Sequence, residues 1–198
     1  MTYFPIKSGV HFLSKNRGFS LIESLVAITV LLTAVVAPLV IVSGSIATAN
    51  IAKDQITAFY LANEAIEYIH NVRDTNFLGG ADWLTGLSDC IVGAGGTEKC
   101  EIDGLAVAQG PGGVIPCIGG VCPNLFLNIY NNPAGTFYNH DILSSGRQTT
   151  FNRSVVITSL SADEAKVQIT VTWKTGSLLG TGSIDKQFKA VTIMRRWI

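Results

Sequence analysis

One carboxylate near the beginning of an apolar run needs a chemical reason. Glu23 is the only charged residue between Phe19 and Val42, and the basic residues Lys15 and Arg17 stand shortly before that run. An ionised carboxylate on a helix within lipid costs roughly 2.5 to 3.5 kcal/mol even on insertion scales that give low values. Glu23 therefore either lies at the membrane interface, where the helix dipole favours it, or pairs with a cation from another chain.

The apolar run from Phe19 to Val42 has the length of a membrane-spanning helix. Its roughly 24 residues would extend about 36 Å as a helix, which is enough to cross the hydrocarbon core of a bilayer. The apolar core of a secretory signal peptide is shorter, about 7 to 15 residues, and ends at a cleavage site on its far side. Because the run has no polar face, we expect residues 19–42 to be a membrane anchor and not a buried helix of a soluble protein.

The residues around the start of this run, GFSLIE at positions 18–23, resemble the processing motif of the type IV prepilins. The resemblance implies that a prepilin peptidase cleaves after Gly18, which makes residues 1–18 a leader, and N-methylates the new N-terminal Phe19. It also implies that Glu23, the fifth residue of the mature chain, pairs with the terminal amine of a neighbouring subunit. An ammonium and a carboxylate that meet in a filament core both lose much of their burial cost.

The same resemblance implies other pilin subunits, prepilin peptidase and the bacterial inner membrane as partners. Lys7, Lys15 and Arg17 precede the anchor, and positive charge there favours the cytoplasmic side. The rest of the chain would then lie outside the cytoplasm, on a single-pass anchor before assembly and in an extracellular or periplasmic filament afterwards. The formal net charge of the chain is zero, so nothing indicates attraction to nucleic acid.

Four cysteines lie in the part of the chain expected outside the cytoplasm: Cys90, Cys100, Cys117 and Cys122. Four cysteines can pair in three ways, and the sequence does not choose among them. An oxidising compartment favours disulfides, and the short loops from Cys90 to Cys100 and from Cys117 to Cys122 are the simplest pairing. A zinc site is the alternative, but the spacings are long and no histidine lies within the cluster. We expect no metal and no cofactor.

The helical pattern continues beyond the anchor, at residues 43–77. Apolar residues recur there every three or four positions: Ile56, Phe59, Ala62, Ile66 and Ile69. A polar row lies opposite them: Glu64, Glu67, Asn71 and Asp74. This amphipathic segment should pack its apolar stripe against a globular head. Pro38 removes one backbone donor and should kink the helix or melt a turn, and the glycines at 79–80 should end it.

The remainder of the chain divides into a loop-rich part and a strand-rich part. Residues 78–147 are rich in glycine, proline and asparagine, which indicates loops and short strands held by disulfides. Residues 148–198 show the alternation of an antiparallel sheet, with strands expected at 151–160, 165–174 and 186–197. The predicted fold is α+β: a long N-terminal helix packed against a C-terminal antiparallel sheet, with the Gly- and Cys-rich region between them.

No arrangement of residues predicts an enzyme. His140-Asp141 and Ser144-Ser145 are close in sequence, but no G-x-S-x-G turn is present to build a hydrolase site. Residues 61–67 and Arg73-Asp74 resemble a subgroup of minor pilins described as pilus modification proteins. We therefore expect a structural subunit, a minor pilin or pseudopilin. The alternatives are a pseudopilin of type II secretion or DNA uptake, an uncleaved single-pass membrane protein with a binding head and, last, a soluble enzyme.

Overall fold

The computed structural model describes residues 18–95, 97–104, 113–122, 127–132, 135–140, 147–176 and 183–196. The chain divides into two compact units, residues 1–46 and 47–198. Lys15 and Arg17 of the expected leader lie outside the described residues, as do Asp141, Ser144 and Ser145.

Helix α1, Leu21–Leu78, is continuous through Pro38. The expectation that this proline melts a turn is wrong, because a proline removes a single backbone hydrogen bond and the neighbouring residues of a 58-residue helix keep theirs. The helix ends just before the two glycines, as predicted. Gly80 adopts a positive φ of 69°, and the N–H of Ala81 donates a hydrogen bond of 2.9 Å to the carbonyl oxygen of Asn76.

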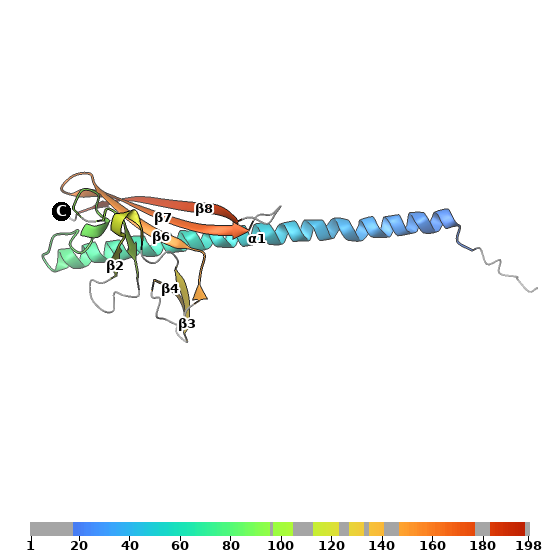
Figure 1. The fold of residues 1–198 in the computed structure, drawn as a ribbon, viewed down its shortest axis with the longest axis horizontal. Helices are drawn as coiled ribbons and strands as arrows, with labels where there is room; N and C mark the ends of the chain where they lie inside the picture. Colours follow the sequence, from blue (N-terminus) through green and yellow to red (C-terminus); the bar gives the residue numbers. More distant parts are fainter. Residues whose placement is uncertain are drawn as a thin grey trace, which may run out of the picture. The chain divides into compact units, whose positions relative to one another are not determined.

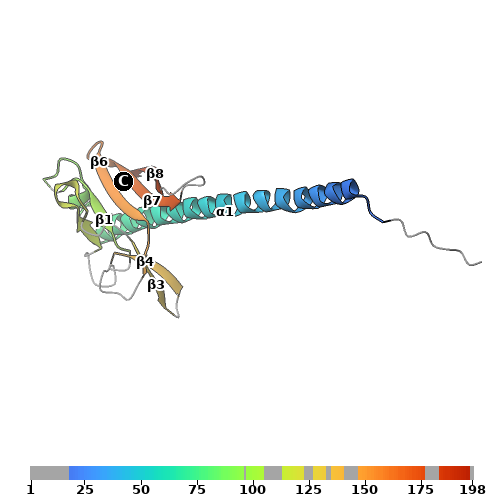
Figure 2. The same cartoon turned by 45° about the vertical axis from the view of Figure 1, so that its right-hand side comes forward.

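The head contains a five-stranded antiparallel sheet in the order β2-β1-β6-β7-β8. Its strands are β1 (Cys100–Ile102), β2 (Val114–Pro116), β6 (Asn152–Ser159), β7 (Glu164–Gly176) and β8 (Ser183–Arg195). A second antiparallel sheet, in the order β4-β3-β5, contains β3 (Asn128–Asn132), β4 (Gly135–Asn139) and β5 (Arg147–Gln148). Two short 3-10 helices complete the described elements, η1 (Ser88–Cys90) and η3 (Ile118–Gly120). Figures 1 and 2 show β6, β7 and β8 lying along the C-terminal half of α1.

The α+β prediction is confirmed, and the three C-terminal strands form the predicted meander of β6, β7 and β8. The sheet is larger than expected because β1 and β2, from the glycine-rich region, extend it. These strands are three residues long, too short to show an alternation in the sequence. The end of the third predicted strand, at Trp197, lies outside the described residues.

The core lies between α1 and the inner face of the sheet. The register places Ile169 of β7 between Val155 of β6 and Ala190 of β8, and Ile169 and Val155 are fully buried. The helix contributes these buried residues: Ala58, Leu61, Ala62, Ala65, Tyr68 and Ile69.

The predicted apolar stripe of α1 is therefore partly wrong. Ile56 and Phe59 are 57% and 48% exposed, and Ile66 is only partly buried. The sheet covers the face that carries Ala58, Ala62 and Ala65, because small side chains let a helix and a sheet approach closely. Hydrophobicity alone did not distinguish this face from the neighbouring one with larger side chains.

Candidate processing and assembly site

The first turn of α1 is capped by Ser20. The hydroxyl oxygen of Ser20 accepts a hydrogen bond from the backbone N–H of Glu23 at 3.2 Å, and its carbonyl oxygen accepts one from the N–H of Ser24 at 3.1 Å. Ser20 is thus the N-cap and Glu23 the third helical residue, the spacing of a capping box. The sequence analysis missed this role of Ser20, although the pattern S-x-x-E at positions 20–23 is the signal for it.

The residues before this cap are accessible. Gly18, Phe19 and Ser20 lie in no helix or strand, and the Phe19 side chain is 76% exposed. A side-chain carbon added at Gly18 would meet no atom within 4 Å. The described residues therefore leave Gly18 and Phe19 exposed, and the helix that follows begins at Leu21.

Glu23 is exposed in the first helical turn. Among the residues that the structure describes, no cation lies within ion-pair distance of its carboxylate. The positive end of the helix dipole favours a carboxylate in this turn, by about 0.3 to 1 kcal/mol at an exposed position. The described part of the chain therefore leaves the side chain of Glu23 available to a partner.

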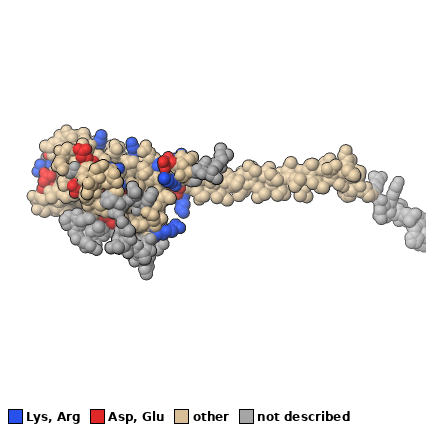
Figure 3. All heavy atoms as spheres, viewed as in Figure 1, with Lys and Arg blue, Asp and Glu red and all other residues tan. Residues whose placement is uncertain are grey.

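The helix that follows is long and apolar enough to cross a membrane, and none of its most apolar 18-residue window is buried within the chain. In Figure 3 the face of this part of α1 shows no charged surface. Its hydroxyl groups donate to backbone carbonyls of the preceding turn: Thr29 to Val26 at 2.8 Å, and Ser45 to Ile41 at 2.9 Å. Such bonds make these residues compatible with lipid, where polar groups must be satisfied internally.

Residues 13–37 match the family model of the prokaryotic N-terminal methylation motif. The chain carries a prepilin-type methylation motif. Gly18, Phe19 and Glu23 all lie inside the matched segment, so the resemblance seen in the sequence is confirmed. The motif supports a pilin-like subunit that prepilin peptidase processes. Comparisons of the whole chain with curated proteins and with solved structures give no match.

The head is organised around a buried arginine that no pattern in the sequence singled out. Arg153 of β6 is fully buried. Its guanidinium donates to the carbonyl oxygens of Leu61 on α1 at 2.8 Å and of Ile102 on β1 at 2.5 Å. The carboxylate of Glu64 lies 3.2 Å away. A buried charge is tolerated only when it is paired and hydrogen-bonded, so this cluster fixes α1 against both strands.

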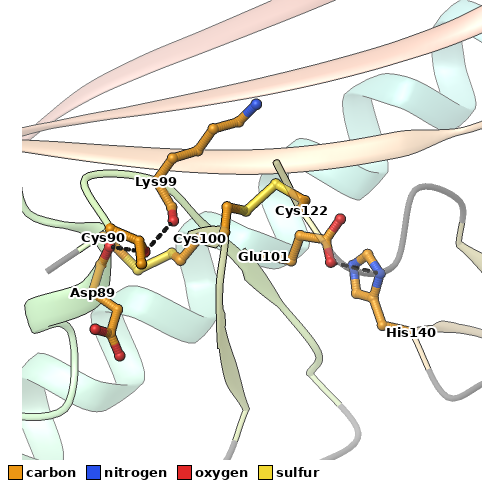
Figure 4. Close-up of a disulfide and its surroundings, with 9 residues drawn as sticks. Asp89, Cys90, Lys99, Cys100, Glu101, Cys122 and His140 are labelled. Carbon is orange, nitrogen blue, oxygen red and sulfur yellow. Dashed lines mark hydrogen bonds and ion pairs between the residues drawn. A yellow bond between two sulfur atoms is a disulfide. The ribbon is translucent and has the colours of Figure 1, made fainter. Parts of the chain in front are cut away.

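A second buried polar cluster lies beside β1. Nδ1 of His140 is 3.7 Å from a carboxylate oxygen of Glu101, and both side chains are fully buried (Figure 4). The backbone N–H of His140 donates to Asp103 at 3.2 Å. His140 therefore lies beside two carboxylates, those of Glu101 and Asp103. Within the described part of the chain, no group of three or more His, Cys, Asp or Glu side chains is arranged to hold a metal ion.

Tyr68 of α1 joins this polar region. Burial raises the pKa of its hydroxyl above 10, and the negative charge of Asp103 raises this pKa further, while a hydrogen bond with the backbone of Gly113 opposes the rise. A side-chain carbon at Gly113 would lie 2.6 Å from the Tyr68 hydroxyl and 2.8 Å from the Asp103 carbonyl oxygen. Only glycine fits there, so Tyr68 holds the residue that precedes β2 against the helix.

Disulfides join Cys90 to Cys100 and Cys117 to Cys122, the pairing with the shortest loops. Cys90 and Cys100 belong to the hydrophobic core and connect η1 to the first residue of β1 (Figure 4). The second disulfide closes a loop around η3. The described cysteines include no free thiol, so the cluster is structural and not a zinc site.

Proposed function

We propose that the chain is a structural subunit, a minor pilin or pseudopilin, of a type IV pilus or a related filament. Prepilin peptidase removes residues 1–18 and methylates Phe19, residues 19–42 hold the subunit in the inner membrane, and α1 then joins the core of the filament. The observation that carries this proposal is the exposed Glu23 inside the methylation motif. It lies in the capped first turn of a helix that is long and apolar enough to cross a membrane.

The chemistry of assembly follows from two groups that are costly in an apolar environment. Cleavage after Gly18 creates an ammonium on Phe19, and Glu23 supplies a carboxylate one turn further along. Within one chain the cap holds Glu23 in the helix, so the ammonium of a neighbouring subunit is the natural partner. Pairing the two groups lowers the desolvation cost of both. The pair forms only when Phe19 of one subunit lies level with Glu23 of its neighbour, so it favours that alignment of the two helices.

The partners and location follow from this sequence of steps. Before assembly the subunit is a single-pass protein of the bacterial inner membrane, with its head outside the cytoplasm. Afterwards it lies in an extracellular or periplasmic filament among other pilin subunits. Disulfides at Cys90–Cys100 and Cys117–Cys122 support an oxidising compartment for the head.

Intact mass spectrometry of the chain, produced in cells with and without prepilin peptidase, tests this proposal. We expect the peptidase to remove residues 1–18 and leave an N-terminal phenylalanine one methyl group heavier. Gly18→Val should block the cleavage but leave the anchor in the membrane, because its apolar run is unchanged. An intact Met1 in cells that cleave another prepilin would contradict processing and favour the uncleaved membrane-anchored binding protein.

A further inference from the structure

A cleft of about 380 Å³ opens on the head between α1 and the second sheet. Its polar and charged lining includes Lys53 and Asp54 of α1, Tyr138 of β4, and Arg147, Gln148 and Thr150 of the segment that leads to β6. All of these residues belong to the unit that begins at Ala47. Two cations and one carboxylate therefore face one small space.

The structure describes no ion pair for these three charges. Each of the other described arginines, Arg73, Arg153, Arg195 and Arg196, lies within ion-pair distance of a carboxylate. Arg147 alone among the described arginines does not, and Lys53 and Asp54 likewise form no ion pair with a described residue. The cleft thus presents positive and negative groups to which the described part of the chain supplies no ion-pair partner.

The carboxylate of this cleft belongs to Asp54, which is half-buried on α1. Burial raises the pKa of the Tyr138 hydroxyl, and the negative charge of Asp54 raises this pKa further. A simple anion would meet repulsion from Asp54, whereas a ligand with an anionic and a cationic end would satisfy both kinds of group.

We propose that this cleft binds a phosphate ester that carries an amine, the chemistry of an ethanolamine phospholipid headgroup. Arg147 and Lys53 hold the phosphate, for which guanidinium and ammonium groups are the usual ligands. Asp54 accepts the ammonium end. Gln148 and Thr150 add neutral hydrogen-bonding groups along the ligand.

A membrane lipid is the nearest source of such a group. In the sequence, Lys53 follows the end of the apolar run at Val42 by eleven residues, and lipid headgroups lie just outside the hydrocarbon core that such a run can cross. This source rests on the proposed membrane anchorage, whereas the chemistry of the cleft does not. A soluble phosphate ester with an amine would use the same groups.

The test measures how well ligands protect Lys53 from a brief acetylation, read by peptide mass spectrometry on the full chain in maltoside micelles. Because the amine of phosphoethanolamine also consumes the reagent, acetylation of each lysine is scored relative to the other exposed lysines in the same sample. We expect free phosphoethanolamine to lower the relative acetylation of Lys53 several-fold and to leave that of Lys189, on β8, unchanged. Glycerol phosphate and inorganic phosphate should need about tenfold higher concentrations for the same protection.

Variants of the cleft test the role of each charge. Arg147→Gln should raise the phosphoethanolamine concentration that protects Lys53 about tenfold, and Asp54→Asn should abolish the advantage of phosphoethanolamine over glycerol phosphate. Lys189→Gln is the matched control and should change neither value.

A second arm places the full chain in vesicles. Phosphatidylethanolamine vesicles should protect Lys53, and bilayers of a phosphate-free galactolipid should not. Protection in both would mean that the membrane surface merely covers Lys53, and would overturn the lipid source. Equal protection by phosphoethanolamine and inorganic phosphate, or by neither, would overturn the proposed site. Because the micelle arm needs neither cleavage nor a bilayer, its failure is distinct from failure of the processing test.

Discussion

The guanidinium of Arg153 donates a hydrogen bond of 2.8 Å to the carbonyl oxygen of Leu61, in the middle of the helix. A helical carbonyl already accepts from the N–H four residues later, so this bond uses its second lone pair. The same guanidinium holds Ile102 on β1. One side chain therefore connects α1 to two strands, β1 and β6, that lie far from it in sequence.

Replacing Arg153 should cost more stability than replacing any surface arginine. We expect Arg153→Met to lower the free energy of unfolding by about 3 to 5 kcal/mol, because it leaves two carbonyl oxygens and Glu64 without their buried cation. Urea unfolding of the chain in detergent, followed by the near-ultraviolet signal of the buried Trp83 and Trp173, measures this.

The matched control for that substitution is Arg195→Met. Arg195 pairs with Glu164 at 2.8 Å, but its side chain is 75% exposed. Exposed pairs contribute at most about 1 kcal/mol, so this variant should unfold near the wild-type urea concentration. Equal losses in the two variants would mean that burial of Arg153 contributes nothing to the link between helix and sheet.

The raised pKa of Tyr68 predicts that the folded state loses stability at alkaline pH. The neutral hydroxyl is favoured in the folded state, so the contribution of Tyr68 is fully present below its unfolded pKa near 10 and is lost as pH rises through the higher folded pKa. Asp103→Asn removes a negative charge and should lower the pKa of Tyr68 while keeping the oxygen that accepts from His140. The ultraviolet absorbance of tyrosinate follows this titration.

Tyr68→Phe identifies which part of that titration belongs to Tyr68. In this variant the tyrosinate absorbance that appears at the highest pH should decrease by the contribution of one tyrosine. Asp103→Asn should then no longer change that part of the titration. An Asp103→Asn titration that coincides with wild type would show that burial alone sets this pKa.

The two disulfides should differ in their effect on stability. Loops of this size each account for about 2 to 3 kcal/mol in the chain-entropy model, so loop length hardly separates them. The double variant Cys90→Ala/Cys100→Ala should nevertheless lose more than Cys117→Ala/Cys122→Ala, because only the first pair belongs to the hydrophobic core. Thermal unfolding of both double variants decides this, and equal losses would contradict a role for core packing.

Local patterns in the sequence predicted the elements with strong periodicity. The alternation in β7 and the glycines after Leu78 have local physical causes, and both elements lie where we expected them. The GFSLIE pattern similarly located the methylation motif. The buried role of Arg153 depends on where Leu61 and Ile102 meet in space, and no local pattern carries that information. The cleft lined by Lys53 and Arg147 could not be predicted either, because segments that are distant in the sequence form it.

The carboxylate of Glu23 should matter for assembly and not for folding or processing. Glu23→Gln keeps the capped helix, because the cap uses the backbone N–H of residue 23, and it lowers the cost of membrane insertion. It removes the negative charge that attracts a neighbour's ammonium. We expect normal cleavage after Gly18 but at least a tenfold loss of the subunit from sheared filaments. Immunoblotting measures this as the amount of subunit in the filaments relative to the amount in the membrane.

Ser24→Ala, on the next residue of the same turn, is the control and should assemble normally. Wild-type incorporation of Glu23→Gln would exclude the ion pair and assign Glu23 to the membrane interface.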